Sequence, residues 1–208
     1  MNSNPEVVEL DVPHGLARVH LRRVNEPRAA VVLGHGAGGG VEAPDLAAAA
    51  AAAVSTKLTV ALVEQPYRVA GRRSPPRAPV LDEAWAAVVE HLRARELAGL
   101  PLIVGGRSLG GRVACRTAAE TGAIAVLCLA FPLQPPRRGD NLPPSRLAEL
   151  DAVTVPMLVV QGDRDPFGIP PAGPRREVVQ VAGNHGLKAD LEAVQAAVAE
   201  WLARITGT

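Results

Sequence analysis

Apolar residues gather in short runs along the chain, and longer stretches rich in Ala separate them. From residue 29 onward these runs are continuously apolar, which is typical of strands buried on both faces of a sheet. Their alternation with helical stretches predicts a parallel sheet joined by right-handed crossovers. Before residue 29, the segments 6–12 and 17–22 alternate apolar and polar positions around a turn at His14-Gly15. This pattern predicts an antiparallel hairpin at the edge of the sheet.

The chain is long enough for one sizeable core and shows no interdomain linker, so we predict a single α/β domain over residues 1–208. Besides the hairpin, the predicted strands are 29–33, 58–63, 102–104, 124–129, 157–161 and 177–181, and the predicted helices are 44–56, 81–97, 108–121 and 188–205. Proline-rich loops cover 64–79 and 131–145. Because the segment 131–154 between two strands is only about two dozen residues long, it has no room for a lid domain with its own core.

The composition narrows the classes of function. The 208 residues have a formal net charge of +1 and 2% aromatic residues, which indicates neither a nucleic-acid surface nor rings for stacking bases. The apolar run 46–54 is far shorter than the ~20 residues that span a bilayer, and the first residues do not resemble a signal peptide. These features predict a cytoplasmic protein. Cys115 and Cys128 fall in a predicted helix and strand, where we expect them to be small core residues.

The sharpest chemical signal is the sequence GRSLGG at 106–111, which directly follows the strand PLIVG and opens a predicted helix. This context is what a G-x-S-x-G nucleophile elbow requires, although a structural glycine-rich turn is an alternative. Ser108 must sit in a strained turn so that its hydroxyl projects above the sheet. Gly106 and Gly110 flank it because side chains there would collide as strand and helix close together. Ser108 is therefore the predicted nucleophile.

A second glycine-rich segment, LGHGAGG at 33–39, follows an earlier strand. In proteins with a nucleophile elbow, such a loop supplies one backbone N–H of the oxyanion hole, and the residue after the nucleophile supplies the other. The predicted donors are Ala37, with Gly38 as its alternative, and Leu109. We expect His35 to pack the loop rather than to take part in chemistry.

The same glycines permit a rival interpretation. Gly34, Gly36 and Gly39 satisfy the dinucleotide-binding pattern G-x-G-x-x-G, and Glu64 ends the next strand. However, two strands precede the pattern, and Glu64 lies beyond the expected spacing of ~20 residues. A dinucleotide site would also leave the serine elbow without a role.

Two further segments supply an acid and a base. The sequence GDRDP at 162–166 follows one predicted strand, and GNHG at 183–186 follows the next, so both lie at the carboxyl edge of the sheet. The order Ser, Asp, His is that of the hydrolases with this elbow. His185 is the predicted general base. Either Asp163 or Asp165 could reach His185. In proteins with this elbow, the acid usually lies three residues after the glycine that ends the strand, here Gly162, which favours Asp165. We expect Asp163 to cap the turn.

These motifs resemble the α/β-hydrolase superfamily, and more narrowly the small dienelactone-hydrolase-like proteins grouped with testis-expressed protein 30 and the hydrolase-like domain of NSL-complex subunit 3. The resemblance covers about residues 31–185 and rests on HGAGG, GGRSLGGR, QGDRDPFG and NHGLK. It implies an α/β-hydrolase fold with a mostly parallel sheet, helices on both faces and no lid domain. It also implies a site formed by Ser108, Asp165 and His185. Gly186 stands where relatives often have Ser.

The expected activity is cleavage of an ester or related acyl bond of a small-molecule substrate through an acyl-enzyme intermediate. We expect no cofactor and no metal, since no His, Cys or carboxylate cluster has ligand spacing. Arg72, Arg73 and Arg107 are candidates for binding an anionic part of the substrate, because guanidinium groups match carboxylate and phosphate geometry. Solvated or ion-paired arginines are the alternative. A non-catalytic interaction domain is the alternative to the enzyme.

Overall fold

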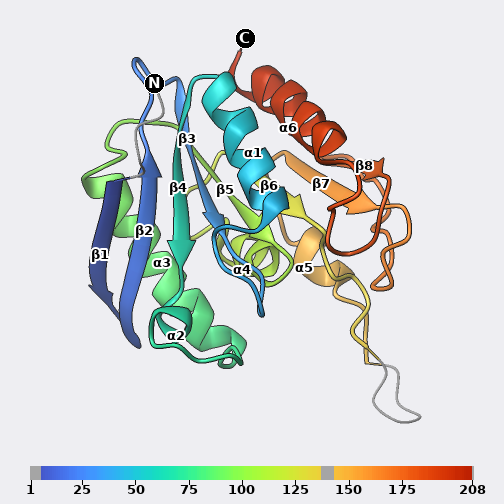
Figure 1. Cartoon of the computed structure of the whole chain (residues 1–208), viewed down its shortest axis with the longest axis horizontal. Helices are drawn as coiled ribbons and strands as arrows, with labels where there is room; N and C mark the ends of the chain where they lie inside the picture. The colour runs from blue at the N-terminus through green and yellow to red at the C-terminus, as the bar shows by residue number, and fades with distance from the viewer. Residues whose placement is uncertain (1–5, 137–142, 208) are drawn as a thin grey trace.

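The computed structural model describes residues 6–136 and 143–207, and these form an eight-stranded sheet with helices on both faces (Figure 1). The strand order is β1-β2-β4-β3-β5-β6-β7-β8. The strands are β1 (Glu6–Val12), β2 (Gly15–Arg22), β3 (Ala29–Gly34), β4 (Leu58–Glu64), β5 (Leu102–Arg107), β6 (Ala125–Leu129), β7 (Met157–Gly162) and β8 (Arg176–Val181). β1 and β2 form the predicted antiparallel edge hairpin, β2 is antiparallel to β4, and the remaining pairs are parallel.

The helices divide the core into two layers. Helices α1 (Pro44–Ser55) and α6 (Leu191–Thr206) cover one face of the sheet, and α3 (Ala78–Ala94) and α4 (Leu109–Thr117) cover the other (Figure 1). Alternate residues of β3 serve the two layers: Val31 packs in the α1 and α6 core, whereas Val32 packs in the α3 and α4 core. Strands buried in this way on both faces explain the continuous apolar runs of the sequence.

Two short helices were not predicted. Helix α2 (Pro66–Val69) lies in the first proline-rich loop, and α5 (Leu147–Asp151) lies in the segment between β6 and β7. Helices of four and five residues are too short to show a 3.6-residue period in the sequence. In the described part of the β6–β7 segment, α5 is the only helix, and no lid domain covers the sheet.

The boundaries of the longer helices differ from the predictions by a few residues. The last helix begins at Leu191 rather than residue 188, because the Asp190 side chain accepts a hydrogen bond from Ala193 N (2.9 Å) and caps it. Helix α3 begins at Ala78, three residues earlier than predicted, with a proline in its first turn. No helix among residues 6–136 and 143–207 combines the length and apolar character needed to cross a membrane.

The strand order rules out the dinucleotide-binding interpretation. Counted from β3, the parallel strands follow the order 2-1-3-4-5-6, whereas the Rossmann fold has the order 3-2-1-4-5-6. The chain passes from β3 to β4 on one side and then crosses to β5 on the other. The sheet therefore has its topological switch point between β3 and β5, where open α/β sheets bind ligands.

Candidate active site

The turn between β5 and α4 has the strained geometry of a nucleophile elbow. Ser108 adopts φ 50° and ψ −105°, a backbone conformation that L-residues rarely adopt. Its amide donates a hydrogen bond to Leu129 O (2.8 Å), which fixes the turn against the end of β6. The side chain of Ser108 stays partly exposed.

Two glycines, Gly106 and Gly110, allow this turn to form. A Cβ atom on Gly106 would lie 2.4 Å from Gly34 O, and one on Gly110 would lie 2.3 Å from the same oxygen. Both neighbours are backbone atoms, so a side chain could not be accommodated by a change of rotamer. The prediction that side chains at these positions would collide is confirmed, and the collision is with the end of β3. The glycine loop and the elbow thus pack backbone against backbone.

Ser108, His185 and Asp165 form a continuous chain of hydrogen bonds. His185 Nε2 lies 3.0 Å from Ser108 Oγ, and His185 Nδ1 lies 2.8 Å from Asp165 Oδ2. A carboxylate can only accept, so Nδ1 carries the proton and Nε2 is free to accept the serine hydroxyl proton. The structure brings together the three residues that the sequence singled out from three separate loops.

Asp165 is held by partners that sequence reasoning missed. Its side chain is fully buried, and Gln161 Nε2 donates to Oδ2 (2.8 Å) while the Phe167 amide donates to Oδ1 (2.9 Å). Gln161 also bonds both backbone groups of Phe131, so it ties the end of β7 to the segment after β6. In the sequence, Gln161 is a lone polar residue at the end of the predicted apolar strand 157–161, and nothing in that pattern indicates which group it bonds.

Asp163 faces a different group. Its Oδ1 accepts a hydrogen bond from Gly183 N (2.8 Å), two residues before the histidine. Asp163 therefore supports the loop that carries His185 and does not contact the imidazole. The Phe167 ring approaches that imidazole edge-on, with centroids 4.5 Å apart. It limits how far the imidazole can tilt.

The glycine loop after β3 is braced by two aromatic side chains. His35 is buried, with Nδ1 2.8 Å from Gly36 O and Nε2 accepting from Gln65 N (3.2 Å). Burial lowers the pKa of His35 and favours this neutral form. Tyr67 donates its hydroxyl proton to Ala37 O (3.1 Å), and burial raises the pKa of Tyr67 to about 12, which keeps it protonated. The expectation that His35 packs the loop is confirmed, whereas the contact of Tyr67 with Ala37 was not foreseen.

The two predicted oxyanion donors flank the switch point. Ala37 lies in the loop after β3, and Leu109 is the first residue of α4. An amide in the first turn of a helix has no intrahelical acceptor and points along the helix dipole toward developing negative charge. The candidate nucleophile, base and carboxylate and the two predicted oxyanion donors therefore all lie at one edge of the sheet.

Residues 27–189 of the chain match the family described as alpha/beta hydrolase domain. The chain belongs to this family. The match begins just before β3 and ends after the loop of His185, so it includes all the predicted site residues. A search of curated protein sequences finds no match.

Solved structures of other hydrolases have the same fold. The serine hydrolase without lid XC6422 from Xanthomonas campestris superposes with a TM-score of 0.78 at 19% identity, over 98% of this chain and 96% of that one. Dienelactone hydrolase from Anabaena variabilis gives a TM-score of 0.76 at 18% identity, over 97% and 99% of the two chains. Est1E from Butyrivibrio proteoclasticus gives 0.76 at 18% identity, over 99% and 100%. At these identities the likeness shows the fold, and it confirms the lidless α/β-hydrolase architecture.

The three candidate arginines of this hydrolase have different surroundings. Arg72 and Arg73 are exposed in the loop after α2, and Arg72 lines a cavity of about 360 Å³ together with Tyr67. Arg107 is partly buried, forms an ion pair with Asp45, and donates a hydrogen bond to the backbone oxygen of His185. Arg72 and Arg73 are thus exposed to solvent, whereas the charge of Arg107 lies beside the opposite charge of Asp45.

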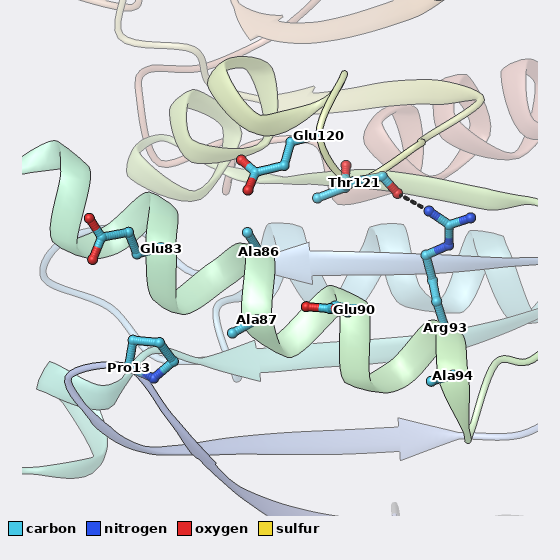
Figure 2. Close-up of a pocket in the computed structure, with 9 residues that line it drawn as sticks. All are labelled: Pro13, Glu83, Ala86, Ala87, Glu90, Arg93, Ala94, Glu120 and Thr121. Carbon is cyan, nitrogen blue, oxygen red and sulfur yellow. Dashed lines mark hydrogen bonds between the residues drawn. The ribbon is translucent and has the colours of Figure 1, made fainter.

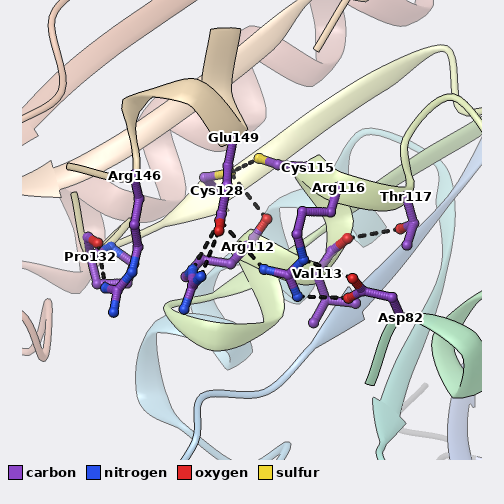
Figure 3. A network of polar contacts seen from close by, with 11 residues as sticks. Asp82, Arg112, Val113, Cys115, Arg116, Thr117, Cys128, Pro132, Arg146 and Glu149 are labelled. Carbon is purple, nitrogen blue, oxygen red and sulfur yellow. Dashed lines mark hydrogen bonds and ion pairs between the residues drawn. The ribbon is translucent and has the colours of Figure 1, made fainter. Parts of the chain in front are cut away.

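A charged network fixes the helix that begins at the elbow. Arg116 of α4 pairs with Asp82 of α3 (Nη2–Oδ1 2.6 Å), and Arg112 pairs with Glu149 of α5 (Nη2–Oε1 2.5 Å) (Figure 3). The arginines and their partners are partly buried. Helix α4 is therefore tied to a neighbour on each side, and α5 contributes to the site by holding α4.

A larger cavity lies elsewhere, along α3 and the end of α4 (Figure 2). It has a volume of about 750 Å³ and is lined by the small residues Ala86, Ala87 and Ala94 and by the carboxylates of Glu83, Glu90 and Glu120. None of the predicted site residues lines it, so its size does not make it the candidate site. Among the described residues, no three His, Cys, Asp or Glu side chains are grouped to hold a metal ion.

Proposed function

We propose that this protein is a serine hydrolase that cleaves an ester or related acyl bond through an acyl-enzyme, with Ser108, His185 and Asp165 as its catalytic triad. The observation that carries the proposal is the hydrogen-bond chain from Ser108 Oγ through His185 to Asp165. The strained elbow supports it as well, because a strained conformation persists only where the surrounding structure holds it, and such residues cluster at active sites.

The first half of the reaction is acylation. His185 Nε2 takes the proton of Ser108 as Oγ bonds to the acyl carbon, and the carbonyl oxygen becomes an oxyanion. The amides of Ala37 and Leu109 stabilise this oxyanion, and each such donor is worth about 10²–10³ in turnover. The oxyanion then collapses, the bond to the leaving group breaks, and the leaving group takes the proton back from His185.

The second half is hydrolysis of the acyl-enzyme. A water molecule gives a proton to His185 Nε2 and bonds to the acyl carbon, and Ser108 Oγ leaves with that proton as the acid is released. Asp165 stabilises the imidazolium in both halves and keeps the proton on Nδ1. No other reactant is required.

The lidless site suits acyl esters, bulky ones included, and the similar solved structures include Est1E with bound ferulic acid and a dienelactone hydrolase. Arg72 and Arg73 are proposed to contact an anionic group of the substrate, because both are exposed in a loop at the same edge of the sheet. The cytoplasmic location stays a prediction from the sequence.

A serine-directed fluorophosphonate probe tests the proposal. The folded protein should become labelled, and peptide mapping should place the label on Ser108. The Ser108→Ala variant should not react. Heat-denatured protein should also stay unlabelled, because unfolding separates Ser108 from the imidazole of His185. A folded wild-type protein that stays unlabelled would favour the non-catalytic interaction domain.

A further inference from the structure

Arg107 reaches three parts of the site from the position next to the nucleophile. Its Nε lies 2.8 Å from Asp45 Oδ2, at the start of α1. Its Nη2 donates to the backbone oxygen of His185 (3.1 Å). Its Nη1 lies over Gly36, where a Cβ atom would come within 2.6 Å of it. One guanidinium thus bridges the elbow, the glycine loop, helix α1 and the histidine loop.

Asp45 fixes the direction of this guanidinium. The carboxylate is fully buried, and its Oδ1 accepts a hydrogen bond from Leu46 N (3.0 Å). Burial raises the pKa of Asp45, and the positive charge of Arg107 acts in the opposite direction. A buried carboxylate is costly unless it is paired, so Arg107 is held toward Asp45 rather than free to swing into solvent.

We infer that Arg107 is a positioning residue, which sets the distance between Ser108 and His185 by anchoring the His185 backbone to the elbow. Arg107 and Ser108 are joined by one peptide bond, and the ion pair with Asp45 restrains the arginine side chain, so the contact to His185 O links the loop of the base to the nucleophile. This inference rests on the proposed function. It replaces the expectation that Arg107 binds substrate, because two of its nitrogens already face internal acceptors.

Backbone hydrogen bonds hold the histidine loop at Gly183 O and Asn184 O, and Arg107 adds a contact at the backbone of His185 itself. Gly183 adopts φ 131° and His185 lies two residues further along, between glycines that leave the backbone few steric limits. Asp163 holds the start of the loop at Gly183 N, and Arg107 holds it at His185 itself. A displacement of the imidazole by about 1 Å can cost ~10²-fold in rate.

The test compares Arg107→Lys and Arg107→Met with the wild type on 4-nitrophenyl acetate and on the 4-nitrophenyl monoester of succinic acid. Fluorophosphonate titration gives the concentration of reactive sites, and rates are expressed per site. Lys keeps a charge opposite Asp45 and is expected to fold, but its single ammonium cannot bridge Asp45 and His185 O as the planar fork does. Arg176→Lys is the matched control, because Arg176 is a partly buried arginine that, like Arg107, pairs with an aspartate (Asp151) and donates to a backbone oxygen (Pro171 O), and neither partner belongs to the His185 loop.

We expect both Arg107 variants to lose about 10²-fold in kcat on either ester with little change in KM, and Arg176→Lys to keep the wild-type kcat. The melting temperature of Arg107→Lys should stay close to that of the wild type while its kcat falls. An unchanged kcat per site would overturn the inference in favour of a purely structural role. A rise in KM for the succinyl ester alone would overturn it in favour of substrate binding. If the wild type neither labels nor turns over, the proposed function fails and this inference fails with it.

Discussion

Ser108 shows how the site is built at the scale of a single residue. Holding a non-glycine residue at positive φ costs roughly 1–3 kcal/mol, and the surrounding structure must supply that stability. Here the Ser108 amide donates a hydrogen bond to Leu129 O at the end of β6, and Gly106 and Gly110 pack on the Gly34 backbone. The result is a hydroxyl that is partly exposed and within 3.0 Å of its base.

The two aspartates after β7 make a matched pair of variants. Asp165→Asn should lower kcat by up to ~10⁴-fold, because an amide at Oδ2 favours the wrong tautomer of His185. Asp163→Asn keeps an amide oxygen that can accept from Gly183 N and loses only the carboxylate charge, so the free energy of unfolding should fall by about 1 kcal/mol at most, with kcat largely kept.

Turnover of 4-nitrophenyl acetate and thermal unfolding of both variants provide the measurement, with circular dichroism to verify folding. An inactive Asp163→Asn beside an active Asp165→Asn would reverse the assignment of the acid.

At the scale of elements, the closest packing is between the end of β3 and the start of α4. Gly110→Ala would place a methyl group 2.3 Å from Gly34 O, so β3 and α4 would have to separate. We expect unfolding free energy to fall by roughly 1–3 kcal/mol or more and labelling of Ser108 by the fluorophosphonate to be lost.

Gly39→Ala is the control, since nothing lies within 4 Å of a Cβ atom there. Urea unfolding gives the free energy of unfolding of the two variants, and fluorophosphonate labelling reports whether Ser108 is still reactive. Equal stability of the two variants would contradict the packing described here.

The bracing of the glycine loop predicts a dependence of stability on pH. The pKa of His35 is lowered in the folded protein by burial, so the unfolded chain binds a proton that the folded chain excludes. Stability from this residue is therefore present above the unfolded pKa of 6.5 and is lost as pH falls below it. His35→Gln should reduce the decrease in melting temperature between about pH 7.5 and pH 5.5. Equal decreases in variant and wild type would show that His35 does not contribute.

The sequence predicted those elements that have a long apolar period, and it missed those that depend on contacts between distant segments. The eight strands and the four longer helices follow from the alternation of apolar runs, and the site residues follow from glycine-rich motifs at strand ends. Helices α2 and α5 were missed because they are too short to show a period. Gln161 and Tyr67 were missed because their roles depend on partners 30 residues away in sequence.

Arg107 illustrates the same limit at the site. Its place in the elbow motif was evident, but its charge partner Asp45 lies in a helix more than 60 residues earlier, and no motif spacing connects the two residues. The ion pair of Arg107 with Asp45 is the alternative that the sequence analysis left open beside a substrate contact.

At the scale of the whole molecule, the fold gathers the site at one point. The switch point between β3 and β5 brings the glycine loop beside the elbow, and β7 and β8 carry the acid and the base to the same edge of the sheet. In the described part of the β6–β7 segment only α5 intervenes, so this edge has no lid domain above it. The proposed function therefore requires that Ser108 becomes acylated during turnover.

The most direct measurement is rapid acid quenching of the protein during turnover of 4-nitrophenyl acetate, followed by peptide mass mapping. We predict an acetyl group on the peptide that contains Ser108, and a fall in kcat of up to ~10⁶-fold in Ser108→Ala. Acetylation at another residue, or a Ser108→Ala variant that hydrolyses the ester at the wild-type rate, would contradict the account.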